Sequence, residues 1–232
     1  MVKKIEDLQV VILAGGKGTR LKEHTKSIPK PMVKVLGKPI ITYIIKHYRS
    51  YGIKNFIIAS GYKSKIIKNY FKDDPYINVV YTGKDTLTGG RVKRLSKYIN
   101  GTFFLTYGDG ISDINIKSLY KFHKNHKKIA TITAVHPISR FGEILLNSRN
   151  TVLKFNEKPQ VKNDWINGGF FIFNKEIFKY LRNDEEILEK YPLQKISKIK
   201  QLKAYRHKRF WHCIDTIRDI EIVSNLLKNE YK

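Results

Sequence analysis

The apolar positions of the first eighty residues fall into short, β-branched runs that alternate with longer stretches of helical periodicity. The runs are too short for ordinary helices and predict strands covered on both faces, at residues 10–14, 55–60 and 79–82. Helices are predicted between them at residues 39–51 and 64–71. This alternation predicts an α/β fold in which helices cover both faces of a central, mostly parallel sheet.

The rest of the chain extends this pattern. Strands are predicted at residues 102–107, 129–135, 170–173 and 202–206, and helices at residues 92–98, 116–126 and from 215 onward. Two short apolar segments, 144–146 and 152–155, flank a polar tetrapeptide and predict a β-hairpin. With 232 residues the chain can bury one large core, so we expect a single domain over residues 1–232.

A glycine-rich loop follows the first predicted strand directly. Gly15, Gly16 and Gly18 lack the Cβ atoms that would keep backbone N–H groups from converging on an anion. Thr19 and Arg20 can add a hydroxyl and a permanently charged guanidinium, which suits a triphosphate. The spacing fits neither the dinucleotide fingerprint G-x-G-x-x-G nor the P-loop G-x-x-x-x-G-K-[ST]. The alternative is a tight strand-to-helix turn with incidental lysines.

A second candidate site lies after the strand predicted at residues 102–107, where Asp109 stands between Gly108 and Gly110. Ligands of open α/β sheets lie beyond the carboxyl ends of the strands, where the glycine loop is also expected. A carboxylate there can hold Mg²⁺ through an oxygen while phosphate oxygens complete the octahedron. The sequence therefore predicts a magnesium–nucleotide site at this edge of the sheet.

Two other features have both a functional and a structural interpretation. Gly89 and Gly90, in a loop before the helix predicted at 92–98, would let a flat nucleobase approach the backbone, but an ordinary helix-entry loop explains them equally well. His123 and His126 lie one turn apart on a lysine-rich helix, and we expect them to be solvated. A zinc site is not expected there because no Cys, Asp or Glu completes one nearby.

The loop Ala14-Gly15-Gly16-Lys17-Gly18-Thr19-Arg20-Leu21, followed by Pro29-Lys30-Pro31-Met32, resembles the signature of the sugar nucleotidyltransferases. These enzymes convert an NTP and a sugar 1-phosphate into an NDP-sugar and pyrophosphate. Further motifs, spread from about residue 10 to 227, resemble the glucose-1-phosphate cytidylyltransferases: Thr88-Gly89-Gly90-Arg91, Tyr107-Gly108-Asp109-Gly110, Phe141-Gly142, Glu157-Lys158-Pro159, Asn167-Gly168-Gly169 and Asp215-Thr216. The glutamine that uridylyl and thymidylyl enzymes carry near Gly89 is absent, which favours cytidylyl transfer.

The resemblance implies a Rossmann-like three-layer α/β/α nucleotidyltransferase fold with a mixed, mostly parallel sheet and a small β-rich sugar-binding insertion. Its parts would be a nucleotide-binding part at about 8–135, a sugar-phosphate-binding part at about 136–215 and a C-terminal helix at 216–230. One departure is the lack of the long insertion that this subfamily carries between the helix at 64–71 and the Thr-Gly-Gly loop. Because that insertion helps subunits associate, its absence leaves open whether the protein is a monomer or a homo-oligomer.

The resemblance also assigns roles to individual residues. The nucleotide would be bound by Leu13, Ala14, Gly15, Gly16, Gly18, Thr19, Arg20, Lys30, Thr88, Gly89, Arg91, Gly108 and Asp109. The sugar phosphate would be bound by Tyr107, Gly142, Glu157, Lys158, Asn167 and Gly168. Mg²⁺ would be held by Asp109 and Asp215, with Arg20, Lys30 and Lys158 completing the catalytic group. Without the resemblance, Asp215 would serve equally well as a helix N-cap, and Glu157-Lys158 would be an ordinary surface dipeptide.

Charge and cysteine content add limits on partners and compartment. Lys and Arg exceed Asp and Glu by 45 to 20, which would attract any polyanion, but the lysines are spread over nearly every predicted helix and no nucleic-acid-binding motif is present. The single cysteine, Cys213, excludes an intramolecular disulfide. No signal peptide and no apolar run of membrane-spanning length is found, so we expect a cytoplasmic protein without a membrane or nucleic-acid partner.

Together these features predict Mg²⁺-dependent transfer of CMP from CTP to glucose 1-phosphate, for surface-polysaccharide or deoxysugar biosynthesis. Direct in-line attack on the α-phosphorus needs no protein nucleophile, and it requires the carboxylates of Asp109 and Asp215 to meet in space. One alternative is the same chemistry with another acceptor, such as a heptose 1-phosphate, or another NTP. An alternative of a different class is a catalytically silent nucleotide-binding regulatory protein.

Overall fold

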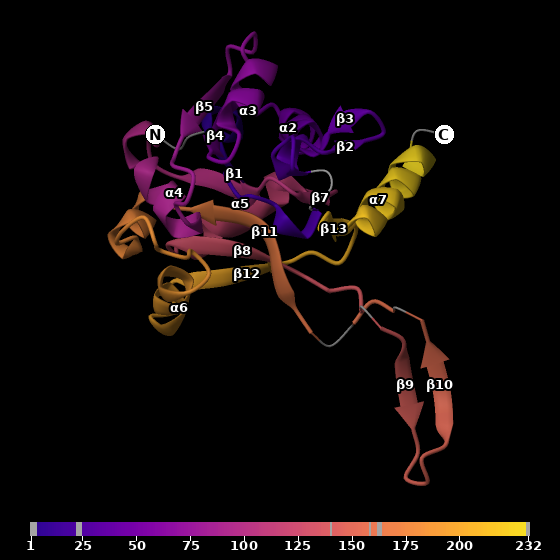
Figure 1. The fold of residues 1–232 in the computed structure, drawn as a ribbon. Helices are drawn as coiled ribbons and strands as arrows, with labels where there is room; N and C mark the ends of the chain where they lie inside the picture. The colour runs from indigo at the N-terminus through magenta and orange to yellow at the C-terminus, as the bar shows by residue number, and fades with distance from the viewer. Residues whose placement is uncertain (1–3, 22–24, 140, 158, 162–163, 231–232) are drawn as a thin grey trace.

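The computed structural model describes residues 4–21, 25–139, 141–157, 159–161 and 164–230, and its centre is a seven-stranded sheet with the strand order β12-β8-β11-β6-β1-β4-β5 (Figure 1). The strands are β1 (Gln9–Ala14), β4 (Asn55–Ser60), β5 (Ile77–Tyr81), β6 (Phe103–Tyr107), β8 (Ala130–Val135), β11 (Ile166–Phe173) and β12 (Leu202–Arg206). All neighbouring pairs are parallel except the two that β11 makes with β6 and β8. The predicted α/β class and the mixed, mostly parallel sheet are therefore confirmed.

Two apolar layers lie on opposite faces of this sheet. Side chains along β1 alternate between them, because Val10 and Ile12 belong to one cluster of buried residues and Val11 and Leu13 to the other. The first layer contains buried residues of α2 (Ile40–Arg49), α3 (Ser64–Tyr70), α5 (Ile116–His126) and α7 (Ile217–Glu230). The second contains those of α4 (Thr88–Arg94), the 3₁₀ helix η5 (Lys175–Tyr180) and α6 (Tyr191–Lys198). The three-layer arrangement follows from this alternation.

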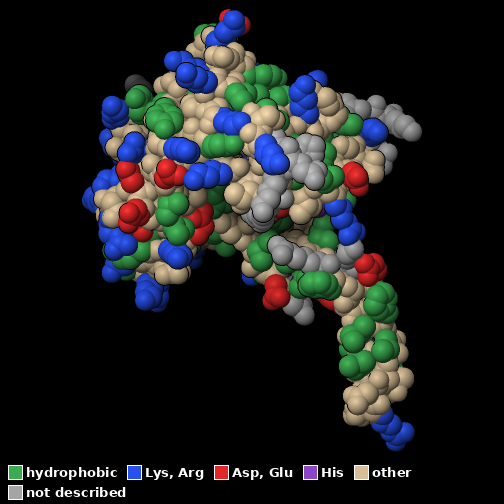
Figure 2. All heavy atoms as spheres, viewed as in Figure 1, with side chains coloured by type: hydrophobic (Ala, Val, Ile, Leu, Met, Phe, Trp, Pro, Cys, Tyr) green, Lys and Arg blue, Asp and Glu red, His purple; other side chains and the backbone are tan. Residues whose placement is uncertain are grey.

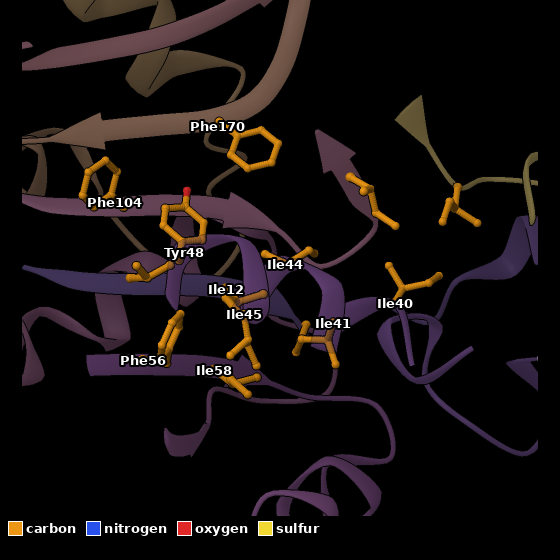
Figure 3. Packing of buried hydrophobic residues seen from close by; sticks show 14 of the residues in the cluster. Ile12, Ile40, Ile41, Ile44, Ile45, Tyr48, Phe56, Ile58, Phe104 and Phe170 are labelled. Atoms are coloured by element: carbon orange, nitrogen blue, oxygen red, sulfur yellow. The ribbon is translucent and has the colours of Figure 1, made fainter. Parts of the chain in front are cut away.

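The packing of the first layer can be followed in Figure 3. The ring of Tyr48, from α2, lies 5.5 Å from the ring of Phe104 on β6 and 6.2 Å from that of Phe170 on β11. All three side chains are almost completely buried. Aromatic contacts of this kind tie α2 to the centre of the sheet and fix the strand ends that carry the candidate site.

The predicted hairpin is present and extends away from the rest of the molecule (Figure 1). It consists of β9 (Glu143–Leu146) and β10 (Val152–Asn156), which pair antiparallel. Its apolar side chains are about half exposed or more, from 46% for Leu146 to 62% for Phe155, and they form the apolar surface visible along the hairpin in Figure 2. On the body, the face shown carries Lys and Arg side chains scattered over many elements, as expected from the sequence.

Several short elements complete the chain. The 3₁₀ helices are η1 (Ile5–Asp7), η2 (Thr19–Leu21), η3 (Lys30–Met32) and η4 (Ser96–Tyr98). Two small ribbons are formed by β2 (Lys34–Val35) with β3 (Lys38–Pro39) and by β7 (Gly110–Ser112) with β13 (Trp211–Cys213). Among the described residues, none of the helices has the length and apolar character needed to cross a bilayer.

Several predicted boundaries are wrong. The strand expected at 170–173 begins at Ile166, so the Asn-Gly-Gly segment before it lies within β11. The helix expected at 92–98 begins at Thr88 and ends at Arg94, so the adjacent glycines lie within α4 and not in a loop before it. The terminal helix begins at Ile217 and not at residue 215, because Thr216 and Asp219 cap it reciprocally. The Thr216 hydroxyl accepts from the Asp219 N–H at 3.3 Å, and the Asp219 carboxylate accepts from the Thr216 N–H at 2.7 Å.

Candidate active site

The glycine loop leaves β1 at the carboxyl edge of the sheet. Gly16 has open space where a Cβ would lie, so a ligand can approach its backbone. Gly18 has φ +63°, a left-handed conformation that favours glycine, and a Cβ there would lie only 2.8 Å from the Cβ of Lys30. The backbone of Thr19 and Arg20 forms the short helix η2, and the Thr19 side chain is exposed. The Arg20 side chain lies outside the described part of the chain.

Lys30 lies between two carboxylates that are distant in sequence. Its ammonium donates to Asp109 Oδ2 at 2.6 Å and to Asp215 Oδ1 at 2.5 Å. Only 8% of Lys30 is exposed, and burial by itself would lower its pKa, but the two carboxylates outweigh burial and raise the pKa of Lys30. The Pro-Lys-Pro lysine is therefore a fixed positive charge.

The β7–β13 ribbon explains why Asp109 and Asp215 meet. Asp109 immediately precedes β7, and Asp215 follows β13 by two residues. Cys213 pairs with Gly110 across the ribbon, and the Ile214 N–H donates to the Asp109 carbonyl at 2.9 Å. Thr216 serves as the cap of α7, so the alternative role of Asp215 as the N-cap is wrong.

The residues around Lys30 suit a hard divalent cation. Within the described part of the chain, Asp109, Asp215 and Cys213 each offer one ligand atom, all within 4.8 Å of one another. Carboxylate oxygens are ligands that Mg²⁺ prefers, whereas a cysteine sulfur is not. The ammonium of Lys30 already shows that the two carboxylates can share one cation. Asp109 and Asp215 are thus the residues that would hold the metal.

The guanidinium of Arg91, a residue expected to bind the nucleotide, forms hydrogen bonds with the protein backbone. Arg91 is 4% exposed, and its guanidinium donates to carbonyl oxygens of Gly15 (3.0 Å), Ser60 (3.2 Å) and Gly83 (2.7 Å). It also donates to the Thr82 hydroxyl at 2.8 Å and the Lys84 carbonyl at 3.3 Å. Burial lowers the pKa of Arg91. The side chain thus joins the loop after β1 to the ends of β4 and β5.

Gly89 and Gly90 are explained by packing within the chain. A Cβ on Gly89 would lie 2.8 Å from the Glu186 carbonyl oxygen, and one on Gly90 would lie 2.4 Å from that of Asp184. Both glycine N–H groups donate to Glu186 O. The segment 184–188 fills the space beside these two Cα atoms. The prediction that the two glycines make room there for a nucleobase is therefore wrong.

A carboxylate that sequence reasoning missed links a residue expected to bind the nucleotide with one expected to bind the sugar phosphate. Glu189 accepts from the Thr88 hydroxyl at 2.7 Å and from the Tyr107 phenol. Asn167 Nδ2 donates to the same phenol oxygen at 3.2 Å. Burial, and then the nearby Glu189 charge, raise the pKa of Tyr107, so the phenol stays protonated. Glu189 follows a run of charged residues, and no signal in the sequence distinguished it from them.

The other sugar-side residues form two groups. Tyr107, Asn167 and Gly168 lie together, with Trp211 Nε1 donating to the Gly168 carbonyl at 2.7 Å. Gly142 and Glu157 lie together at the base of the hairpin, where a Cβ on Gly142 would be 3.1 Å from Glu157 Oε2. Lys158 is outside the described residues.

The other residues expected to bind the nucleotide lie beside the loop, at the ends of β1 and β6. Leu13 and Ala14 are buried at the end of β1, so only their backbone can face a ligand. The Gly108 N–H donates to the Leu13 carbonyl at 3.0 Å, and a Cβ on Gly108 would lie 2.8 Å from Pro31. Gly108 therefore allows the strand end that bears Asp109 to pack against the Pro-Lys-Pro segment.

The expectation of two solvated histidines is wrong for His123, which is 3% exposed. Asn174 donates to the Lys128 carbonyl through Nδ2, so its Oδ1 faces His123 and accepts from His123 Nε2 at 3.1 Å. His123 Nδ1 then accepts from the Thr131 hydroxyl at 2.8 Å, and that oxygen accepts from His126 Nε2 at 2.7 Å. The chain of hydrogen bonds fixes a neutral imidazole at position 123.

A mostly parallel sheet with a glycine loop and a carboxylate pair at its carboxyl edge places the chain in the class of α/β enzymes that process nucleotides. A family model described as "Nucleotidyl transferase" matches residues 9–228, and the chain belongs to this family.

The relatives narrow the class further. The chain is 40% identical to the glucose-1-phosphate cytidylyltransferase of Salmonella typhimurium, over 91% of this chain and 93% of that protein. It is 35% identical to the D-glycero-alpha-D-manno-heptose 1-phosphate guanylyltransferase of Campylobacter jejuni, over 85% of this chain and 89% of that protein. A crystal structure of HddC from Yersinia pseudotuberculosis complexed with GMP-PN is similar with a TM-score of 0.75 and 27% identity, covering 95% of this chain and 99% of that one. The chain is a sugar-phosphate nucleotidyltransferase. The similarity to enzymes of this family argues against the alternative of a catalytically silent regulatory protein.

Proposed function

We propose that the protein transfers CMP from CTP to glucose 1-phosphate in the presence of Mg²⁺ and releases CDP-glucose and pyrophosphate for the synthesis of surface polysaccharides or deoxysugars. The choice of base and sugar is supported by the similarity to glucose-1-phosphate cytidylyltransferase of Salmonella typhimurium. The observation that carries the chemistry is the meeting of Asp109, Asp215 and Lys30 beside the glycine loop.

Two anionic substrates must be brought together, so charge neutralisation and alignment supply most of the catalysis. The backbone of Gly16 and Gly18, with Thr19 and Arg20, binds the triphosphate. Lys30 neutralises charge at the α-phosphate, and Lys158 orients the sugar phosphate. A phosphate oxygen of the sugar phosphate forms the new bond to the α-phosphorus as the bond to pyrophosphate breaks.

The cation would be held by the carboxylates of Asp109 and Asp215. When bound, Mg²⁺ supplies charge neutralisation at the α-phosphate and the leaving pyrophosphate. On the sugar side, Tyr107, Asn167, Gly168, Gly142 and Glu157 would receive the hexose hydroxyls. The Asn167 amide offers a second N–H donor, while the Tyr107 phenol, whose hydrogen is donated to Glu189, and the Glu157 carboxylate offer acceptors.

The test is a matrix of four NTPs against several sugar 1-phosphates, with pyrophosphate release as the readout. It includes GTP with a heptose 1-phosphate, because the relative from Campylobacter jejuni carries that name. The expected result is the highest kcat/KM for CTP with glucose 1-phosphate and no release after chelation of the divalent cation. Preference for another pair would replace the proposed substrates, and absence of release with every pair would overturn the proposed reaction.

A further inference from the structure

The side chain of Glu189 receives the hydrogens of two hydroxyl groups that are distant in sequence. One carboxylate oxygen accepts from the Thr88 hydroxyl at 2.7 Å, and the other accepts from the Tyr107 phenol. An ionised carboxylate can only accept hydrogen bonds. The hydrogens of both hydroxyl groups are therefore directed toward Glu189, and their lone pairs are left for other donors.

Glu189 is not needed to hold its own segment in place. The residues just before it are already fastened to α4 by backbone groups, because the Gly89 N–H donates to the Glu186 carbonyl at 2.8 Å. The Leu188 N–H donates to the Thr88 hydroxyl oxygen at 2.9 Å, so that oxygen keeps a partner without Glu189. A purely structural role thus leaves the contact between Glu189 and the phenol unexplained.

The ring of Tyr107 is positioned by packing. A Cβ on Gly169 would lie 2.4 Å from Tyr107 Cδ2, and the Phe171 ring meets the Tyr107 ring edge-on with 5.8 Å between the centroids. Packing of the ring places the phenol oxygen but does not decide where its hydrogen points. The carboxylate of Glu189 decides this, and the phenol oxygen is then an acceptor on its other side.

The orientation of the Asn167 amide follows from the direction of that hydrogen. Asn167 Nδ2 donates to the phenol oxygen at 3.2 Å, and Asn167 Oδ1 accepts from the Gly169 N–H at 2.8 Å. The hydrogen bonds therefore run in one direction, from Gly169 through Asn167 and Tyr107 to Glu189. Because an amide nitrogen carries two hydrogens, Asn167 keeps a second N–H donor that has no partner among the described residues.

We propose that Glu189 is a positioning residue for the sugar 1-phosphate, which draws the phenol hydrogen to itself and so fixes the Asn167 amide with its second N–H available to a sugar hydroxyl. The role rests on the proposed function, in which Asn167 meets the sugar. Without Glu189 the phenol can donate to Asn167 instead. The amide would then have to turn over and lose its hydrogen bond from the Gly169 N–H.

The test measures KM for glucose 1-phosphate and for CTP in Glu189→Ala, Glu189→Gln, Tyr107→Phe and the double variant Glu189→Ala/Tyr107→Phe. Glu189→Ala should raise KM for glucose 1-phosphate roughly 10-fold and leave KM for CTP nearly unchanged. Glu189→Gln should recover most of this loss, because its carbonyl oxygen can still accept from the phenol. In the Tyr107→Phe background, Glu189→Ala should cause little further rise, since the hydroxyl through which Glu189 acts is gone.

Glu186→Gln is the matched control. The carboxylate of Glu186 lies in the same segment but pairs with Arg182, at 2.6 Å, and not with the phenol. This variant should leave the ratio of the two KM values unchanged, even if it lowers the temperature of unfolding. A loss of stability in the segment is thereby separated from a change in sugar binding.

Equal rises in both KM values, or additive effects in the double variant, would overturn the inference. If Glu189→Ala does not fold, Glu189→Asp takes its place, because the shorter side chain keeps the charge but cannot reach both hydroxyl groups. Wild-type KM values in Glu189→Asp, together with impaired Glu189→Gln, would show that the charge alone matters and would also overturn it. If the wild type prefers another sugar 1-phosphate, that compound is used for all variants. Failure of the wild type to release pyrophosphate with every substrate pair would instead refute the proposed function.

Discussion

The burial of His123 predicts that the protein loses a measurable part of its stability as the pH falls. Burial lowers the pKa of this side chain from 6.5 to about 4, even though its hydrogen bond to Asn174 acts in the opposite direction. The unfolded chain therefore takes up a proton near pH 6.5 that the folded protein accepts only near pH 4. Between these values the unfolded state holds more protons, so the free energy of unfolding falls as the pH falls. At ~1.4 kcal/mol per pH unit, this one group accounts for about 3 kcal/mol.

The assay is urea unfolding of the wild type and of His123→Gln at a series of pH values from above 6.5 to near 4. Glutamine does not titrate, so the variant should be less stable at neutral pH but should lack this part of the acid-induced loss. His126→Gln is the comparison variant. Burial lowers the pKa of His126 as well, but this side chain is partly exposed, so His126→Gln should remove a smaller part of the acid-induced loss. Identical pH slopes for the wild type and His123→Gln, or an NMR titration of His123 near pH 6.5, would refute the reasoning.

Four further outcomes test the site and its packing. Asp109→Asn should lower Mg²⁺-dependent turnover by ~10²–10³-fold with an unchanged circular dichroism spectrum, and full activity would exclude the metal assignment. Lys30→Met should increase the affinity for Mn²⁺, measured by EPR without nucleotide, because the ammonium that pairs with both carboxylates is gone. Unchanged or weaker affinity would show that the ammonium does not compete with the metal for these carboxylates. Lys158→Ala should raise KM for the sugar phosphate and leave that for CTP almost unaffected, and equal effects would count against its role. Gly90→Ala should destabilise the fold by ~1–3 kcal/mol in thermal unfolding although alanine favours helices, because its Cβ would meet backbone atoms of Asp184; a stabilised variant would contradict the packing.

The order and type of the elements were predictable because the local patterns and the tertiary structure agree. The strand at β4 has the predicted bounds, and the hairpin differs from its prediction by one residue at two of its strand ends. Both follow from patterns of two to six residues, which the sequence displays directly. The α/β class follows from the alternation itself.

The start of α4 could not be predicted in the same way. Two glycines in succession normally disfavour a helix, but here tertiary packing against the segment 184–188 requires them inside one. Packing between segments about a hundred residues apart leaves no periodic signal in the sequence.

The candidate site was predictable only where a motif names the residue. Asp109, Asp215 and Lys30 belong to recognisable motifs, and the structure brings them together. Glu189 and the burial of His123 were missed because each depends on partners distant in sequence, such as Tyr107 and Asn174. Arg91 was noticed, but four of its five acceptors are backbone carbonyls, which are present at every position and therefore give no clue.

The β7–β13 ribbon also determines when the enzyme can begin to work during its synthesis. Domains emerge from the ribosome with the N-terminal part first. A nascent chain that has reached β12 already contains the glycine loop, Lys30 and Asp109, but lacks the strand that brings Asp215 beside them. Incomplete translation products and fragments clipped before β13 therefore contain the glycine loop and Asp109 but not Asp215, and we expect them to lack transferase activity.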